Sequence, residues 1–159
     1  MRTGPVILLA EDDPNDEDLI RLAMAEAHVE CQLDVVRDGV EVIDYLFATG
    51  QHADRDARQM PQLLLLDLKM PRMNGLQVLQ VLRRVRLNDG ATHLPPVVAL
   101  TCSNEDQDIN EAYRWGAHSF VRKPVDFEEF TRAVKQVVGY WLGLNEPPRG
   151  HGKLAMPVG

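Results

Sequence analysis

Acidic, hydroxyl and basic side chains stand at the ends of four apolar runs in this sequence, or directly after them. These residues are Glu11, Asp12, Asp67, Thr101 and Lys123. If the runs are parallel strands, their carboxyl ends meet at one edge of a sheet, where open α/β proteins bind ligands. We therefore expect the five side chains to lie close together. Three carboxylates in a small volume need a proton or a cation to neutralise them, because each raises the pKa of its neighbours.

This set of residues is suited to metal-assisted phosphoryl transfer. Oxygen ligands around an open position fit Mg²⁺, which keeps several waters and typically binds one or two carboxylates together with a phosphate oxygen. The Lys123 ammonium and the Thr101 hydroxyl beside such a metal can stabilise the oxygens of a transferring phosphoryl group. Asp67 would be the nucleophile, since carboxylates form acyl phosphates in covalent catalysis.

Five short apolar runs predict the strands that position these residues. The four leucines at 63–66 are apolar on both faces of a strand, as in a central parallel strand covered by helices. The runs lie at 6–10, 31–36, 63–66, 97–100 and 119–122. A helical pattern follows each run. The sequence therefore predicts an α/β fold, with helices on both faces of a five-stranded parallel sheet.

Cap and turn residues predict where the helices begin. Asn74 with Gln77 three positions later is typical of a capping box, and Ser103 with Asp106 repeats the pattern. The other starts are predicted at Pro14, at Asp38-Gly39 and after Asp126. The acids Asp13, Asp16 and Asp18 are interpreted as helix caps or solvated residues rather than as parts of the site.

Two segments stand outside this regular alternation. The polar stretch 48–62 is long for a loop in a compact α/β unit, which indicates either a functional or a mobile segment. We expect residues 1–144 to form one domain. Residues 145–159 are rich in Pro and Gly and lack periodicity, so they are expected to be a flexible tail or part of a dimer contact.

Size and charge disfavour several other classes of protein. The chain has 159 residues, enough for one domain with its own core, and its 17 Lys+Arg against 24 Asp+Glu give a net charge of −7. That charge argues against nucleic-acid binding, which depends on clustered basic residues. No apolar run reaches the roughly 18 residues of a membrane span, and no signal peptide is recognisable.

The cysteines and histidines point to no additional chemistry. Only Cys31 and Cys102 occur, and we expect a cytoplasmic protein in which both are reduced, small and buried. The five histidines show no ligand spacing, so neither a transition-metal site nor a catalytic histidine is predicted.

Four ordered motifs resemble the receiver domains of two-component response regulators. They are EDD at 11–13, LDLKMPRMNG at 66–75, ALTCS at 99–103 and FVRKP at 120–124. The resemblance covers residues 6–142 and implies a flavodoxin-like sheet of strand order 2-1-3-4-5. It implies a phosphoacceptor switch rather than an enzyme with a metabolite substrate. Asp67 would accept a phosphoryl group from the phosphohistidine of a sensor histidine kinase.

The resemblance also implies a set of Mg²⁺ ligands. Asp12, Asp67 and the backbone carbonyl of Lys69 would bind the ion, with Glu11 acting through water. Lys69 lies two residues after the phosphoacceptor. In receivers this position tunes hydrolysis of the acyl phosphate.

The resemblance also implies roles for residues in or next to the last two predicted strands. Thr101 and Lys123 would contact the phosphoryl oxygens. Phe120 occupies the position of the aromatic switch residue, whose inward rotation accompanies the movement of Thr101. The Lys123–Pro124 bond is expected to be cis, as in most receivers. Cys102 departs from the usual pattern, since receivers mostly carry a small residue such as alanine there, and it narrows access to the site.

A narrower resemblance is to the single-domain regulators that partner bacterial phytochromes. It depends on the 48–62 loop, on the lack of an output domain and on Tyr140-Trp141-Leu142 at the end of the last helix. Those regulators are often dimers through that helix and its extension. Here Val138, Trp141 and Leu142 continue an apolar stripe past the sheet, so we expect a symmetric homodimer and a phytochrome as the kinase partner.

Two functions of other classes remain as alternatives. A Mg²⁺-dependent phosphohydrolase of the aspartyl-phosphate type has a similar carboxylate cluster. It normally carries a second acid two residues after the nucleophile, where this chain has Lys69. A phosphorylation-independent scaffold does not need the intact set of acid, hydroxyl and lysine. The residues therefore favour the switch.

Overall fold

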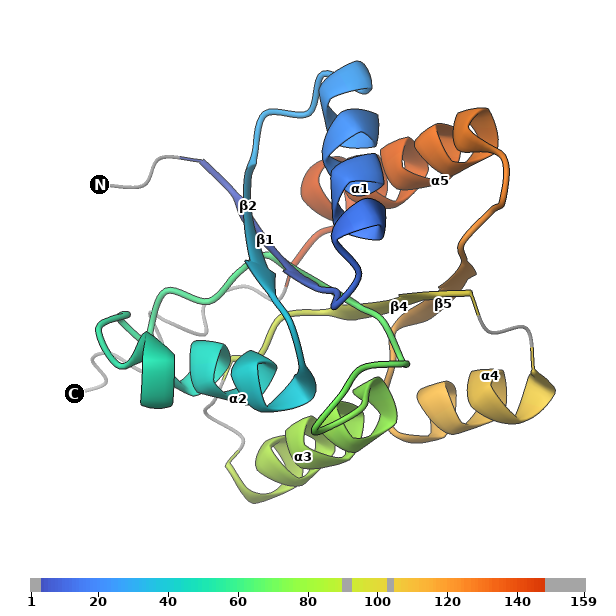
Figure 1. Cartoon of the computed structure of the whole chain (residues 1–159). Helices are drawn as coiled ribbons and strands as arrows, with labels where there is room; N and C mark the ends of the chain where they lie inside the picture. The colour runs from blue at the N-terminus through green and yellow to red at the C-terminus, as the bar shows by residue number, and fades with distance from the viewer. Residues whose placement is uncertain (1–3, 90–92, 103–104, 148–159) are drawn as a thin grey trace.

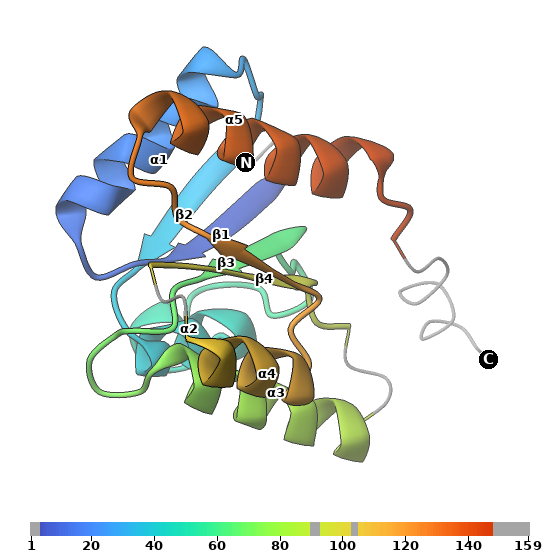
Figure 2. The same ribbon diagram turned by 90° about the vertical axis from the view of Figure 1, so that its right-hand side faces the viewer.

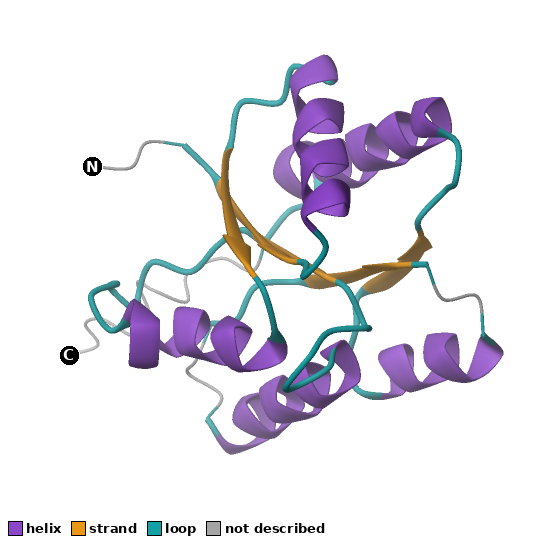
Figure 3. Cartoon of the chain, in the orientation of Figure 1, coloured by secondary structure: helices purple, strands orange, loops and turns teal. Residues whose placement is uncertain are grey.

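A five-stranded parallel sheet forms the centre of the protein (Figures 1 and 3). The computed structural model describes residues 4–89, 93–102 and 105–147. The strands are β1 (Val6–Ala10), β2 (Gln32–Val36), β3 (Leu63–Leu66), β4 (Val97–Thr101) and β5 (Ser119–Arg122). Their order in the sheet is β2-β1-β3-β4-β5, which confirms the predicted fold.

Helices cover both faces of this sheet. They are α1 (Pro14–Glu26), α2 (Gly39–Phe47), α3 (Gly75–Asn88), α4 (Asp106–Arg114) and α5 (Phe127–Gly139), the last continued by a π-helical turn, Tyr140–Leu144. Figures 1 and 2 show α1 and α5 together on one face, with α2, α3 and α4 on the other. None of the helices within the described ranges is long and apolar enough to cross a membrane.

The leucines of β3 supply both hydrophobic cores. Leu64 and Leu66 pack into the cluster beneath α2, α3 and α4, whereas Leu63 and Leu65 pack into the one beneath α1 and α5. All four are at most 1% exposed. Alternate side chains of a strand point to opposite faces, so an uninterrupted apolar run is required wherever both faces are covered.

The predicted starts of three helices are confirmed. The Asn74 side chain accepts from the Gln77 backbone N–H, and the Gln77 side chain accepts from the Asn74 N–H, both at 2.9 Å. Asp38 and Asp126 cap α2 and α5. The predicted Ser103 cap lies outside the described residues. The structure has Glu105 as the N-cap of α4, with no side-chain hydrogen bond to the helix.

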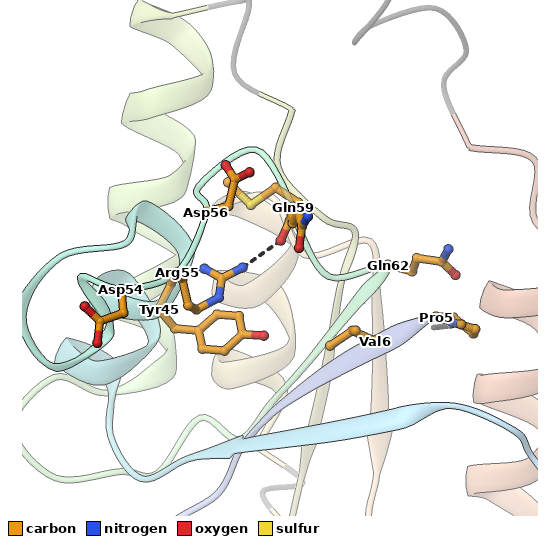
Figure 4. Close-up of a pocket in the computed structure, with 10 residues that line it drawn as sticks. Pro5, Val6, Tyr45, Asp54, Arg55, Asp56, Gln59 and Gln62 are labelled. Carbon is orange, nitrogen blue, oxygen red and sulfur yellow. Dashed lines mark hydrogen bonds between the residues drawn. The ribbon is translucent and has the colours of Figure 1, made fainter. Parts of the chain in front are cut away.

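One arginine holds the loop between α2 and β3 against α2. The Arg55 guanidinium lies 3.8 Å from the centre of the Tyr45 ring and donates to the backbone carbonyls of Tyr45 and Gln59, the latter at 2.6 Å. Figure 4 shows these residues around a cavity of ≈ 530 Å³. The cavity also borders Gly4, Pro5 and Val6, at the amino end of β1. The loop therefore has a defined shape and includes a 3₁₀ turn at Gly50–His52.

The expectation of a cis Lys123–Pro124 bond is wrong, because the described residues contain no cis peptide bond. The trans form of an X–Pro bond is favoured by only about 0.5–1 kcal/mol over the cis form. Residue types alone therefore do not decide the isomer.

A close backbone contact behind Asp67 requires glycine at position 75. A Cβ at Gly75 would lie 2.5 Å from the Asp67 carbonyl oxygen and 2.8 Å from the Leu68 Cα. We expect Gly75→Ala to lower the free energy of unfolding by about 1–3 kcal/mol, the usual cost of overpacking. Gly139→Ala is the matched control, since a Cβ there has no atom within 4 Å. Urea unfolding of both variants checks this, and equal midpoints for the two would contradict it.

Candidate functional site

Three carboxylates meet at the carboxyl ends of β1 and β3. Glu11, Asp12 and Asp67 each offer an oxygen atom, and these atoms all lie within 4.8 Å of one another. The backbone sets this arrangement. The Asp67 N–H donates to the Ala10 carbonyl at 3.1 Å, and the Glu11 N–H donates to the Val36 carbonyl at 3.0 Å. The parallel pairing thus extends one residue past the strands and brings the acids side by side, as the sequence predicts.

Lys123 lies among these acids. Its Nζ donates to Glu11 Oε1, to Asp67 Oδ2 at 3.2 Å and to Asp16 Oδ2 at 2.9 Å. The lysine side chain is only 4% exposed. A backbone hydrogen bond of 2.8 Å from the Lys123 N–H to the Thr101 carbonyl holds it beside the end of β4. The lysine therefore joins the last strand of the sheet to the first and the third.

Burial and the neighbouring charges shift the pKa values of Glu11 and Lys123. Burial raises the pKa of Glu11 to about 7, although the hydrogen bond and charge of Lys123 oppose the rise. For Lys123, burial would lower the pKa, but the charges and hydrogen bonds of Asp67, Glu11 and Asp16 outweigh it, so the pKa lies above its usual value. The ammonium is charged at neutral pH. Three carboxylates, those of Glu11 and Asp67 buried and that of Asp12 exposed, therefore share one ammonium, which is a donor set that suits a divalent cation.

Of the remaining predicted residues, Thr101 and Lys69 lie at the same edge of the sheet, whereas Phe120 lies within β5. Thr101 is completely buried at the carboxyl end of β4, next to β3. The Lys69 backbone N–H donates to Asp67 Oδ1 at 3.0 Å, and its ammonium lies 3.4 Å from Asp108 Oδ2 on α4. Phe120 is half-buried against the cluster beneath α2, α3 and α4, and its backbone N–H donates to the Tyr113 hydroxyl at 3.1 Å.

Sequence reasoning missed Asp16 and misjudged Cys102. Asp16 was interpreted as a cap or solvated residue, yet it contacts Lys123. Asp13 is the cap of α1 and accepts from the Asn15 N–H at 2.9 Å. A weak signal for Asp16 was its place three residues after Asp13, within the first turn of the helix. The prediction that Cys102 is buried is wrong, since this residue, the first after β4, is exposed.

An ion pair links the loops on either side of the site. Arg72, in the loop after β3, donates from Nε to Asp38 Oδ2 at 2.9 Å and from Nη2 to Asp38 Oδ1 at 3.1 Å. Burial would raise the pKa of Asp38, but the hydrogen bonds from Arg72 and from the Glu41 N–H outweigh it, so the pKa lies below its usual value. The loop after β3 is thus tied to the start of α2.

The strand order and this cluster define the receiver class of signalling domain. The model of the response regulator receiver domain family matches residues 7–135. The chain therefore belongs to that family.

Named relatives share most of the length of this chain. It is 35% identical to the probable methanogenesis regulatory protein FilR2 of Methanothrix harundinacea, over 90% of this chain and 87% of FilR2. The phosphorylated cyanobacterial phytochrome response regulator RcpA has a TM-score of 0.78 at 29% identity, covering 92% of this chain and 99% of RcpA. The Mn²⁺-bound response regulator Rcp1 of Synechocystis sp. has a TM-score of 0.75 at 26% identity, covering 91% and 99%.

Asp38→Asn tests the link between the loops, because asparagine still caps α2 but has no charge to pair with Arg72. A folded-state pKa below the unfolded value stabilises the protein above the unfolded pKa, and this stabilisation is lost as the pH falls through the folded pKa. We therefore expect the variant to unfold at lower urea concentration than the wild type at pH 7, with a difference that shrinks towards pH 3. Urea unfolding over this pH range measures it.

Asp56→Asn is the matched control, since Asp56 also pairs with an arginine, Arg58, but on an exposed loop. It should leave the unfolding midpoint close to that of the wild type. A loss of stability in the Asp38 variant that is the same at every pH would contradict the conclusion that the Asp38–Arg72 ion pair stabilises the protein.

Proposed function

We propose that this protein is a phosphorylation-dependent signalling switch in which Asp67 accepts a phosphoryl group from a sensor histidine kinase. The observation that carries this proposal is the position of the Asp67 carboxylate. One of its oxygens accepts from the Lys69 N–H and the other from Lys123, beside Glu11 and Asp12. A carboxylate oxygen attacks phosphorus, the bond from phosphorus to the kinase histidine breaks, and the imidazole leaves with its electron pair.

The donor set suits Mg²⁺. Asp12, Asp67 and the Lys69 carbonyl would bind the ion and Glu11 would act through water, by resemblance to other receivers. When bound, the ion supplies positive charge to the phosphoryl oxygens. The Mn²⁺ in the Rcp1 structure supports a divalent-ion site in this family. Lys123 and Thr101 would contact the remaining phosphoryl oxygens. The support is that both side chains are buried and that one offers an ammonium and the other a hydroxyl.

The output surface would lie around α4, β5 and α5. Thr101 and Phe120 are the proposed switch residues, since they lie at the end of β4 and within β5. The hydrogen bond from the Phe120 N–H to the Tyr113 hydroxyl connects β5 to α4. A movement of Phe120 would therefore displace Tyr113 and with it α4. Phosphorylation then acts by shifting a two-state equilibrium that a partner reads.

A phytochrome is the kinase partner that we propose. The support is the similarity to RcpA, which is a phytochrome response regulator, along nearly the whole of both chains. The phosphohydrolase alternative is disfavoured by Lys69, because that class normally carries a carboxylic general acid two residues after the nucleophile, where this chain has the lysine.

Incubation of the protein with acetyl phosphate and Mg²⁺ distinguishes the switch from the phosphohydrolase and the scaffold. We expect the mass of the intact protein to increase by one phosphoryl group, because Asp67 is the acceptor. Asp67→Asn and removal of Mg²⁺ by EDTA should both abolish the adduct. Asp18→Asn, which removes an exposed acid from α1, should leave it unchanged.

Rapid turnover of phosphate esters would indicate the hydrolase instead, and no adduct under any condition would indicate the scaffold. Replacing acetyl phosphate with a phosphorylated phytochrome kinase in the same assay tests the partner.

We also propose a symmetric homodimer through α5 and the turn that follows it. Of the residues expected in this interface, Val138 is completely buried in the cluster beneath α1 and α5, and Trp141 and Leu142 pack against the same core. The exposed apolar side chains here are instead Tyr140, 47% exposed, and Leu144, 78% exposed. A groove of ≈ 580 Å³ beside this turn is lined by Trp141, Leu142 and His118, among others. Exposed apolar side chains of this size next to a groove favour an interface. A two-fold axis would place the same surface on both subunits.

Sedimentation of Leu144→Asp tests the dimer. A charge in place of this exposed leucine should weaken self-association by about tenfold or more, as truncation of anchor residues does in other interfaces. Leu87→Asp on α3 is the matched control, since Leu87 is 73% exposed and lies outside the proposed interface. A wild-type protein that is monomeric both with and without phosphorylation would refute the dimer.

A further inference from the structure

The Lys123 ammonium has no donor left for a phosphoryl group. An ammonium has three N–H donors and no acceptor. Glu11, Asp16 and Asp67 accept one each. With the side chain 4% exposed, there is little room for the lysine to reach a further acceptor without giving up one of these three.

Asp16 differs from the other two carboxylates in where it lies. Glu11 and Asp67 follow β1 and β3 and belong to the cluster of acids that can hold a metal ion. Asp16 comes from the first turn of α1, at the edge of the site, and its side chain is 28% exposed. It shares no backbone hydrogen bond with the strand ends in the described part of the chain. Its side chain contacts Lys123, which is 107 positions away in the sequence.

We infer that Asp16 is a positioning residue that holds the Lys123 ammonium towards α1 in the unphosphorylated protein and competes with the phosphoryl group for it. This inference rests on the proposed function of the site. When a phosphoryl group is present at Asp67, its oxygens become the stronger acceptors for Lys123. The bond to Asp16 is then the one that can be released, because Asp16 alone can turn to water. Asp16 therefore sets how easily the site accepts phosphoryl-like anions.

Beryllofluoride, which mimics a phosphoryl group on aspartate, tests the inference in the full chain with Mg²⁺. Asp16→Ala should bind beryllofluoride about 5–10 times more tightly than the wild type, the range for relief of one competing charge-assisted hydrogen bond. Fluorine NMR or calorimetric titration measures the dissociation constant. Asp18→Ala is the matched control because it removes an exposed acid from the same helix, and it should leave the constant within about twofold.

A double-mutant cycle with Lys123→Met shows whether Asp16 acts through the lysine. In that background Asp16→Ala should have no further effect on beryllofluoride affinity. An equal gain in both backgrounds, or an equal gain in the Asp18 variant, would overturn the inference, because either result would show a general effect of charge. Weaker binding by the Asp16 variant would overturn it as well.

Asp16→Asn keeps the shape of the side chain, and it should show a smaller increase in beryllofluoride affinity than Asp16→Ala. It tests the inference even if the alanine variant does not fold. If the wild type binds beryllofluoride but no Asp16 variant differs from it, only this inference fails. If the wild type does not bind, the proposed function fails with it.

Discussion

One buried ammonium among several carboxylates determines how this protein is built. Lys123 lies at the end of β5, and the acids it contacts come from β1, β3 and α1. Charges of the same sign repel strongly in a low-dielectric interior. Glu11 and Asp67 can therefore be buried together only if a proton or a positive charge neutralises one of them, and Lys123 supplies a positive charge beside both. The ends of β1, β3 and β5 must consequently lie within reach of one lysine side chain.

The order of the strands makes this alignment possible. Glu11 and Asp67 are neighbours because β1 pairs directly with β3, in a register that Leu9–Leu65 and Ala10–Leu66 define. Two strands, β3 and β4, separate β5 from β1, so only a long side chain can cross their ends to reach Glu11. A lysine satisfies both requirements, since its apolar stem can be buried while its charged head is paired.

Much of this could be predicted from the sequence because it depends on local patterns. Short apolar runs followed by charged residues indicated the strands and the edge where they meet, and the Asn74–Gln77 pair indicated the start of α3. Asp16 was missed because its contact joins residues 107 positions apart, and its own surroundings resemble any helix start. The isomer of the Lys123–Pro124 bond and the exposure of Cys102 likewise depend on tertiary packing. So does the shape of the 48–62 loop, in which Arg55 happens to stack on Tyr45.

That stacked arginine lies at the amino end of the sheet, beside the start of β1 and the approach to β3. The acids and the lysine lie at the opposite end. The long loop can therefore change in length and residue type during evolution without disturbing the ionic cluster, provided that an arginine or an equivalent anchor still reaches Tyr45. Differences in sequence among homologues would then concentrate at the amino ends of the strands. The carboxyl ends would vary less, because the buried charges there must stay paired.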